Sequence, residues 1–234
     1  MCGRFAYYSA REAMAAVFGV EDPPPIEPHY NIAPTQDVTV IRAGEDGRRR
    51  ADLLRWGLVP FWAKDTKIGN RLNNARAETA AGKPAFRAAW RRRRCLVPAD
   101  GFYEWRAGPG GKIPWFVSAA SGRPFAMAGL WEHWEPDGGE DAGEGPLETF
   151  TILTTAPTDL MARLHNRMPL VLGPERSAAW LAGEPPAGAG DSLADPAVAL
   201  RAWPVSRRVN SPANEDASLV EPAGDERLDE TGSG

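Results

Sequence analysis

The sequence is broken into many short segments that favour β-strands, and the spacing between them is irregular and rich in proline and glycine. Residues 37–44 (DVTVIRAG) alternate as a half-buried strand does. Residues 21–36 hold five prolines, which favour an extended loop because proline removes a donor and fixes φ. The regular alternation of strands and long helices that a parallel sheet needs is missing. The pattern predicts an α+β fold, a single domain of mixed or antiparallel sheets folded against each other.

A few helices are expected at the edges of these sheets. Residues 9–19 read as a helix with Ser9 as N-cap and Gly19 as stop. Residues 76–94 are expected to be helical in two pieces around Lys83 and Pro84. A short helix is expected within 158–169, a well-signalled one at 173–183, and a late strand at 199–210. Segments 95–107 and 113–119 resemble the two arms of a hairpin.

The net charge of −4 hides an uneven distribution of charged side chains. Residues 1–131 carry 20 Lys and Arg against 12 Asp and Glu, whereas residues 132–234 carry 7 against 19. Much of the acid lies in a glycine-rich loop at 135–148 and in a tail at 223–234 that is expected to be disordered, so the domain is expected to span 1–222. The rest of the chain is rich in arginine, which binds phosphates through paired hydrogen bonds. This distribution permits nucleic-acid binding.

Composition excludes several classes of protein. No run of about 18 apolar residues is present, which predicts no transmembrane helix, and the N-terminus lacks the pattern of a secretory signal. The two cysteines, Cys2 and Cys95, are too few for a disulfide framework, and no CxxC or Cys/His cluster indicates zinc. We therefore expect a cytoplasmic protein with no metal, no cofactor and no membrane association, in which Cys95 is a small buried residue.

The chain begins MCGRF, so Cys2 directly follows the initiator methionine. Once Met1 is removed, Cys2 offers two nucleophiles on adjacent carbons, a thiol and an α-amine, with ordinary pKa values of roughly 8.5 and 8. The amine can attack an aldehyde to give a Schiff base, and the thiol can then close a five-membered thiazolidine ring. The alternative is that a cysteine at position two is incidental, and this residue alone does not decide between them.

Three other polar sites could serve the same chemistry, and each has a structural alternative. Glu104 lies among the aromatic residues of DGFYEW, where it could shuttle protons or pair with an arginine in a strand. His165, in LHNRMP, could equally be a structural histidine. Asn74 and Arg76 stand two apart, which suits a phosphate or sugar oxygen, although a loop-stabilising amide is the commoner role.

Aromatic and basic runs are also ambiguous one by one. The aromatic residues of PFW (60–62) and YEW (103–105) could pack in the core or stack on unpaired bases. The run RRRR (91–94) is typical of a solvated helix end, which would add attraction for phosphates without specificity.

Together these segments resemble the SOS response-associated peptidase (SRAP) family over roughly residues 1–210. The motifs that carry the resemblance, in order, are MCGRF (1–5), YNIAP (30–34), WGLVPFW (56–62), NNARAET (73–79), RCLVPADGFYEW (94–105), MAGLW (127–131), FTILTTAP (150–157), HNRMPLVL (165–172) and PVSRRVN (204–210). The resemblance implies a barrel-like core with a few flanking helices. It also implies that Met1 is lost and that Cys2 reacts with the aldehyde of an abasic site in single-stranded DNA. The product would be a thiazolidine crosslink that shields the lesion during replication.

The same resemblance assigns roles to individual residues. Asn74 would orient the α-amine and the opened sugar. Glu104 would act as general acid/base in imine formation and in crosslink reversal, and His165 would assist opening of the sugar ring. The expected DNA contacts are Arg4, Arg76 and Arg167 to phosphates, Trp62 and Trp105 to bases, and Thr154 as a polar group lining the site. The family implies a monomer that needs no metal.

Two functions of other classes stay open at this point. A cysteine peptidase could use Cys2, His165 and Glu104 as a thiol hydrolase triad, with self-removal of Met1 as its one obvious reaction. A non-catalytic module could bind single-stranded DNA through the arginines and tryptophans. Covalent attachment to abasic DNA would distinguish the first hypothesis from both alternatives.

Overall fold

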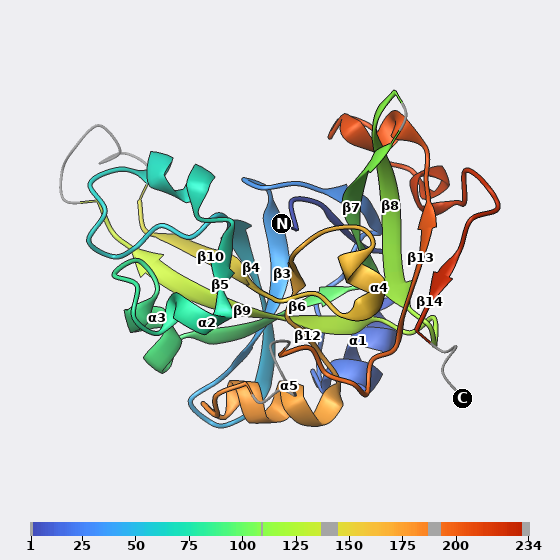
Figure 1. The fold of residues 1–234 in the computed structure, drawn as a ribbon. Helices are drawn as coiled ribbons and strands as arrows, with labels where there is room; N and C mark the ends of the chain where they lie inside the picture. Colours follow the sequence, from blue (N-terminus) through green and yellow to red (C-terminus); the bar gives the residue numbers. More distant parts are fainter. Residues whose placement is uncertain (1, 109, 137–144, 187–192, 231–234) are drawn as a thin grey trace.

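The computed structural model describes residues 2–108, 110–136, 145–186 and 193–230, and its centre is formed by two β-sheets (Figure 1). The first sheet is antiparallel and has six strands. Their order across the sheet is β14 (Leu228–Asp229), β13 (Leu200–Pro204), β8 (Gly111–Ala119), β7 (Gly101–Gly108), β1 (Phe5–Tyr7) and β2 (His29–Ile32). The expected hairpin is confirmed, because β7 and β8 pair along their whole length.

Five strands of the second sheet close into a barrel. Around the ring they are β10 (Leu147–Thr155), β4 (Arg49–Trp56), β3 (Asp37–Ala43), β6 (Arg94–Ala99) and β9 (Phe125–Trp134), and β9 pairs again with β10. Three short strands extend the barrel: β5 (Asn74–Arg76) and β11 (Met168–Pro169) lie along β10, and β12 (Val171–Leu172) lies along β9. The expected α+β fold with a barrel-like core is confirmed. Closure also removes exposed strand edges.

The barrel and the first sheet share one hydrophobic core. Phe5 of β1 meets Trp56 of β4 edge-on, with ring centroids 5.2 Å apart, and Trp56 stacks on Phe150 of β10 at 6.3 Å. All three side chains are fully buried. Large aromatic side chains contribute much of the burial energy of a core, so this stack fixes the N-terminal strand against the barrel.

The helices are short and lie around the sheets (Figure 1). They are α1 (Arg11–Phe18), α2 (Ala77–Ala80), α3 (Arg87–Arg92), α4 (Asp159–Ala162) and α5 (Pro174–Leu181), with 3-10 helices at Thr66–Arg71, Arg207–Asn210 and Ala217–Val220. The two helical pieces expected within 76–94 are α2 and α3, although Arg76 and Arg94 at the ends of that range lie in β5 and β6. Gly19 ends α1 with a left-handed φ of 66°. The expected cap is wrong: Ala10 is the N-cap, because the hydroxyl of Ser9 donates to Asp100 instead. None of the helices in the described ranges is long and apolar enough to cross a membrane.

Three expected boundaries differ from the structure. The domain does not stop at 222, since β14 pairs with β13 and Leu228 is 3% exposed, so the expected tail at 223–234 is wrong as far as residue 230. The loop expected at 21–36 contains β2, and the strand expected at 199–210 ends at Pro204. Of the acidic loop at 135–148, residues 137–144 lie outside the described residues, as do residues 231–234 of the tail.

Candidate active site at the N-terminus

Cys2 is held inside the structure by the strand that follows it. Phe5 and Ala6 of β1 pair with Phe102 and Gly101 of β7. The ladder continues toward the N-terminus, because Tyr103 N donates to Arg4 O at 2.9 Å. Cys2 itself is fully buried. The chain end that the sequence marks as chemically special is therefore ordered beside β7.

Asn74 reaches Cys2 from the barrel. Its Nδ2 donates to the backbone oxygen of Cys2 at 2.7 Å. The chain is fixed just before β5, the strand that carries Asn74, since Asn73 O accepts from Ile152 N of β10 at 3.1 Å and from Trp56 Nε1 at 2.8 Å. The Asn74 Oδ1 atom is buried and accepts no hydrogen bond from the described residues, so it could accept one from an N–H group brought to the site.

Glu104 approaches Cys2 from the other sheet. Its side chain is 2% exposed and follows Tyr103 on β7. Burial raises the pKa of the Cys2 thiol well above its ordinary range, and the nearby Glu104 carboxylate raises that pKa further. The thiol is therefore protonated at neutral pH, with Sγ 3.8 Å from Arg4 O. The site combines a neutral thiol and a buried carboxyl group.

His165, Arg167, Thr154 and Arg76 gather at the end of β10. Thr154 lies opposite Arg76 of β5 and opposite Pro169 of β11. Arg167 N donates to His165 Nδ1 at 3.0 Å, and Arg167 Nη2 donates to Thr154 O at 2.6 Å. Asn74 lies on β5 two residues before Arg76, so the fold brings these predicted residues to the same end of the barrel as Cys2.

The residues predicted to contact DNA differ in their solvent exposure and in their protein partners. Arg76 is exposed and forms no ion pair among the described residues, and Trp62 is 48% exposed. Arg167 makes a paired ion contact with Glu78, at 2.9 and 2.8 Å. Trp105 is partly buried and donates from Nε1 to Asn210 at 2.8 Å.

Arg4 is engaged by the protein itself. Its Nη1 donates to Asn31 Oδ1 and to Val209 O, each at 2.7 Å, and burial lowers the pKa of the guanidinium. Asn31 is fully buried, and its Nδ2 donates to Ser211 O and Asn214 O. Sequence reasoning missed Asn31: the motif YNIAP contains it, but nothing local marks an amide that ties three distant segments together.

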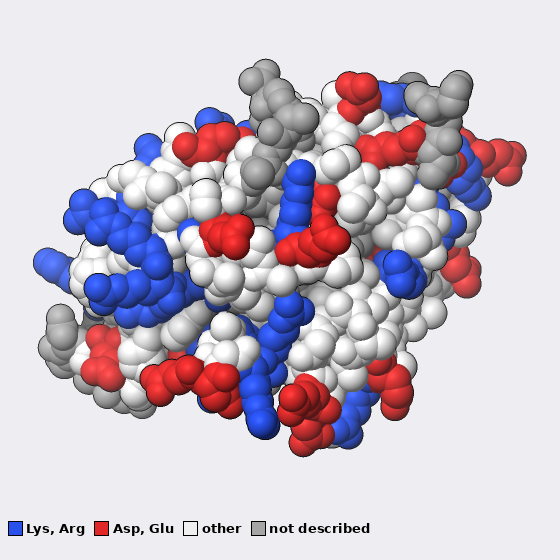
Figure 2. All heavy atoms as spheres, turned by 90° about the horizontal axis from the view of Figure 1, so that it is seen from below, with Lys and Arg blue, Asp and Glu red and all other residues white. Residues whose placement is uncertain are grey.

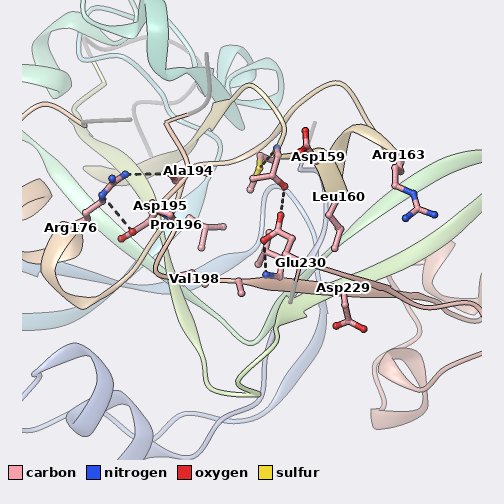
Figure 3. Close-up of a pocket in the computed structure, with 15 residues that line it drawn as sticks. Asp159, Leu160, Arg163, Arg176, Ala194, Asp195, Pro196, Val198, Asp229 and Glu230 are labelled. Carbon is pink, nitrogen blue, oxygen red and sulfur yellow. Dashed lines mark hydrogen bonds and ion pairs between the residues drawn. The ribbon is translucent and has the colours of Figure 1, made fainter. Parts of the chain in front are cut away.

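A cavity of about 520 Å³ is lined by a different set of residues (Figure 3). Its wall comes from α4, from residues 194–200 and from β14, and no predicted site residue lines it in the part of the chain that the structure describes. Two of its carboxylates already have partners: Asp195, which is buried, pairs with Arg176 at 3.5 Å, and Glu230, which is partly buried, accepts from Leu200 N at 2.8 Å. Within the same ranges, no cluster of three or more His, Cys, Asp or Glu side chains could hold a metal ion.

Comparison with known proteins gives a consistent result. The family model described as SOS response associated peptidase (SRAP) matches residues 1–212. The chain is 43% identical to Abasic site processing protein YoqW of Bacillus subtilis (strain 168), over 94% of this chain and 99% of that protein. It is 34% identical to Abasic site processing protein YedK of Escherichia coli (strain K12), over 95% of this chain and 100% of that protein.

A solved structure has the same fold. An X-ray crystal structure of a protein from Bacteroides thetaiotaomicron superposes with a TM-score of 0.77 at 26% identity, over 95% of this chain and 100% of that one. The match covers both the closed barrel and the six-stranded sheet, because almost all of each chain takes part. The chain belongs to the SOS response associated peptidase (SRAP) family.

Proposed function

We propose that this protein processes abasic sites in single-stranded DNA by forming a thiazolidine crosslink between Cys2 and the aldehyde of the opened sugar. The observation that carries the proposal is the position of Cys2, with its carbonyl held by Asn74 and its thiol next to Glu104. Relatives named as abasic site processing proteins match almost the whole chain. The crosslink would shield the lesion during replication in the SOS response.

The reaction begins at the α-amine of Cys2. Hydrolysis of the peptide bond after Met1 exposes this amine, a step that the protein could perform on itself. The amine nitrogen attacks C1′ of the opened sugar, and loss of water gives an imine. The S–H group of Cys2 then adds across the C=N bond, with sulfur bonding to carbon and the proton reaching nitrogen by way of the Glu104 carboxylate. His165 would assist ring opening, and Asn74 would orient the amine.

The protonated state of the thiol supports this order of steps. A thiol whose pKa is raised by burial is a poor first nucleophile, because the thiolate is the reactive form. A cysteine peptidase needs the opposite, a thiol with a lowered pKa beside its base. Burial of the thiol therefore favours attack by the amine first, with sulfur adding to the activated imine. This argues against peptide-bond cleavage as the main activity.

The remaining predicted residues would hold the DNA around the reacting sugar. Arg76 and Trp62 are open to solvent and would contact a phosphate and a base. Arg4, Trp105, Thr154 and Arg167 already have protein partners and would form the wall of the site. The protein would act as a monomer on single-stranded DNA.

The test uses protein whose Met1 has been removed, mixed with single-stranded DNA that carries one abasic site. We expect a heat-stable shifted band and a matching increase in intact mass. The band should disappear in Cys2→Ala, persist in Cys95→Ala as the matched cysteine control, and be absent with undamaged DNA. A band that survives Cys2→Ala would overturn the assignment of the nucleophile.

A second experiment tests the need for the amine. Extending the N-terminus with a tag converts the α-amine of Cys2 into an amide, while the thiol is unchanged. The thiazolidine then cannot form, and we expect no crosslink. Normal crosslinking by the tagged chain would contradict the ring chemistry.

A further inference from the structure

The four consecutive arginines at 91–94 divide into two pairs in the structure. Arg93 forms an ion pair with Glu132 at 2.8 Å, and the guanidinium of Arg94 lies 4.2 Å from the centre of the Trp180 ring. The first contact ties the end of α3 to β9 of the barrel, and the second joins β6 to α5. Arg91 and Arg92 are exposed and form no ion pair among the described residues. The run therefore leaves two positive charges in solvent.

Two more cations precede them along the chain. Arg87 N donates to Lys83 O at 2.8 Å, so the helical turn already begins at Lys83. Arg87 and Arg91 are four residues apart on α3, which places their side chains on one side of the helix, about 5–6 Å apart. Lys83 lies in the turn that leads into α3. Lys83 and Arg87 are also exposed, with no ion pair in the described ranges. We call Lys83, Arg87, Arg91 and Arg92 the α3 basic face.

No acidic residue lies near this face along the chain. Between Glu78 and Asp100 the sequence contains no Asp or Glu, and Glu78 is bonded to Arg167. Seen from below, Lys and Arg gather at the end of the molecule where α3 lies (Figure 2). This concentration of charge is notable in a chain whose net charge is −4.

We propose that the α3 basic face is a second nucleic-acid contact, which holds the sugar–phosphate backbone of the strand that flanks the lesion without reading its bases. The inference rests on the proposed function, because the site at Cys2 would hold the same strand. Arg76 stands at the site, and α2 follows it directly and contacts β5. The seven residues from Arg76 to Lys83 span at most about 25 Å, so a strand of modest length reaches both.

A polyanion fits the α3 basic face better than an acidic protein does. Protein interfaces are centred on apolar side chains. The large hydrophobic side chains that are exposed in the described residues are Leu53, Phe61 and Trp62, and none of them lies on α3. Positive charges repeated at each helical turn instead match a chain that carries one phosphate per nucleotide.

The experiment compares two variants that lose the same charge. One carries Lys83→Gln, Arg87→Gln and Arg91→Gln, and the control carries Arg48→Gln, Arg50→Gln and Arg123→Gln, all exposed elsewhere. Binding of undamaged single-stranded DNA is measured by fluorescence anisotropy over a range of salt, with strands of about forty and about five nucleotides, since binding sites of this kind cover about 4–16.

On the long strand, the first variant should lower the slope of log affinity against log salt by about 2, because each phosphate contact contributes about 0.7. The slope on the short strand and the rate of crosslinking at saturating abasic DNA should stay unchanged. An unchanged slope on the long strand, or an equal loss in the control, would overturn the proposal. The proposal would also be overturned if poly-glutamate displaced the long strand as effectively as competitor DNA of equal charge.

The two proposals can fail separately. If the wild-type protein binds the long strand but never crosslinks to abasic DNA, the proposed function is wrong, while the difference in slope still tests the α3 basic face. If crosslinking is normal and the slopes agree, the α3 basic face alone is wrong.

Discussion

Both cysteines of the chain are fully buried, and burial raises the pKa of each thiol well above its ordinary range. Alkylation requires the thiolate. We expect iodoacetamide at neutral pH to modify neither Cys2 nor Cys95 in the folded protein, during a time that fully modifies a free cysteine. In guanidinium both should react, and intact mass counts the adducts. Rapid modification of Cys2 in the folded protein would show that its thiol is not held as the structure describes.

Glu104→Gln keeps the shape of the side chain and removes the carboxylate that would move the proton. General acid/base groups contribute about 10²–10⁴-fold to rate, so we expect crosslink formation and reversal to slow by about 100-fold. The affinity for undamaged single-stranded DNA should stay within about twofold, because Glu104 is buried and faces Cys2 rather than solvent. Quench-flow gels and anisotropy measure the two quantities. A large loss of affinity would give Glu104 a structural role instead.

Asn31 joins β2 to Arg4 and to the segment 209–214. Removing a buried amide leaves its partners unpaired, at a cost of about 1–3 kcal/mol for each buried group. We expect Asn31→Ala to lower the free energy of unfolding by about 3 kcal/mol and to slow crosslinking, since Arg4 lies two residues from Cys2. Asn31→Asp, which keeps the acceptor for Arg4, should recover part of the crosslinking rate. If Asn31→Ala and Asn31→Asp crosslink at equal rates, the hydrogen bond between Arg4 and Asn31 does not contribute to the reaction at the site.

At the residue scale, the sequence predicts chemistry better than it predicts partners. Cys2 and Glu104 could be singled out because their side chains suggest a reaction whatever surrounds them. The partners of Arg4 and Arg167 could not, because they lie 205 and 89 residues away along the chain. Both arginines are predicted to contact phosphate, and the structure adds protein partners to each: an amide and a backbone oxygen for Arg4, and a carboxylate for Arg167.

Among the elements, α2 restrains the end of β10 at the site through the ion pair of Glu78 with Arg167, which also bonds to Thr154. Burial raises the pKa of Glu78, but the hydrogen bonds that it accepts from Arg167 and from backbone N–H groups, together with the charge of Arg167, outweigh this effect and leave the pKa below its ordinary value. We expect Glu78→Gln to free Arg167, to tighten binding of single-stranded DNA, and to steepen its salt dependence by about 1. A group with a lowered pKa loses its ionic contact only as the pH falls through that pKa. The difference between Glu78→Gln and the wild type should therefore persist as the pH falls past the ordinary pKa of a glutamate, about 4.3, and close only at lower pH. Weaker binding by Glu78→Gln would mean that the pair positions Arg167 for DNA.

Elements were predictable where local chemistry alone decides them. The hairpin β7–β8 and the left-handed stop at Gly19 follow from turn residues and a lone glycine. Ser9 was misassigned because Asp100, 91 residues away, takes its hydroxyl. The three-residue strand β5 could not be predicted, since it is a strand only because β10 pairs with it.

Over the whole molecule, the site depends on the docking of the two sheets. Asn74 comes from the barrel and Glu104 from the first sheet, and Cys2 lies between them. The aromatic stack of Phe5, Trp56 and Phe150 joins the same two parts. Closure of the barrel was not deducible from strand patterns, because the ring needs the parallel pairing of β4 with β10, in which Trp56 lies opposite Phe150. The ordering of the N-terminus is thus a property of the docking of β1 against the barrel.

The C-terminal strand gives a last test of that view. Leu228 is 3% exposed on β14, at the opposite end of the first sheet from β1 and β2. Truncating a buried leucine removes apolar contacts and leaves a cavity, so we expect Leu228→Ala to lower the free energy of unfolding in urea by about 2–4 kcal/mol. Leu53→Ala is the matched control, since Leu53 is 67% exposed, and it should change stability by less than about 0.5 kcal/mol.

The rate of crosslinking by folded Leu228→Ala should equal that of the wild type, because three strands, β13, β8 and β7, separate β14 from β1. Equal stability of the two leucine variants would mean that residues 223–230 contribute nothing to the fold, as composition alone suggests. A crosslinking rate that falls together with stability would mean that the order at Cys2 is transmitted across the entire first sheet. Loss of stability with an unchanged rate is the result expected if Phe5 and the barrel are sufficient to hold the N-terminus.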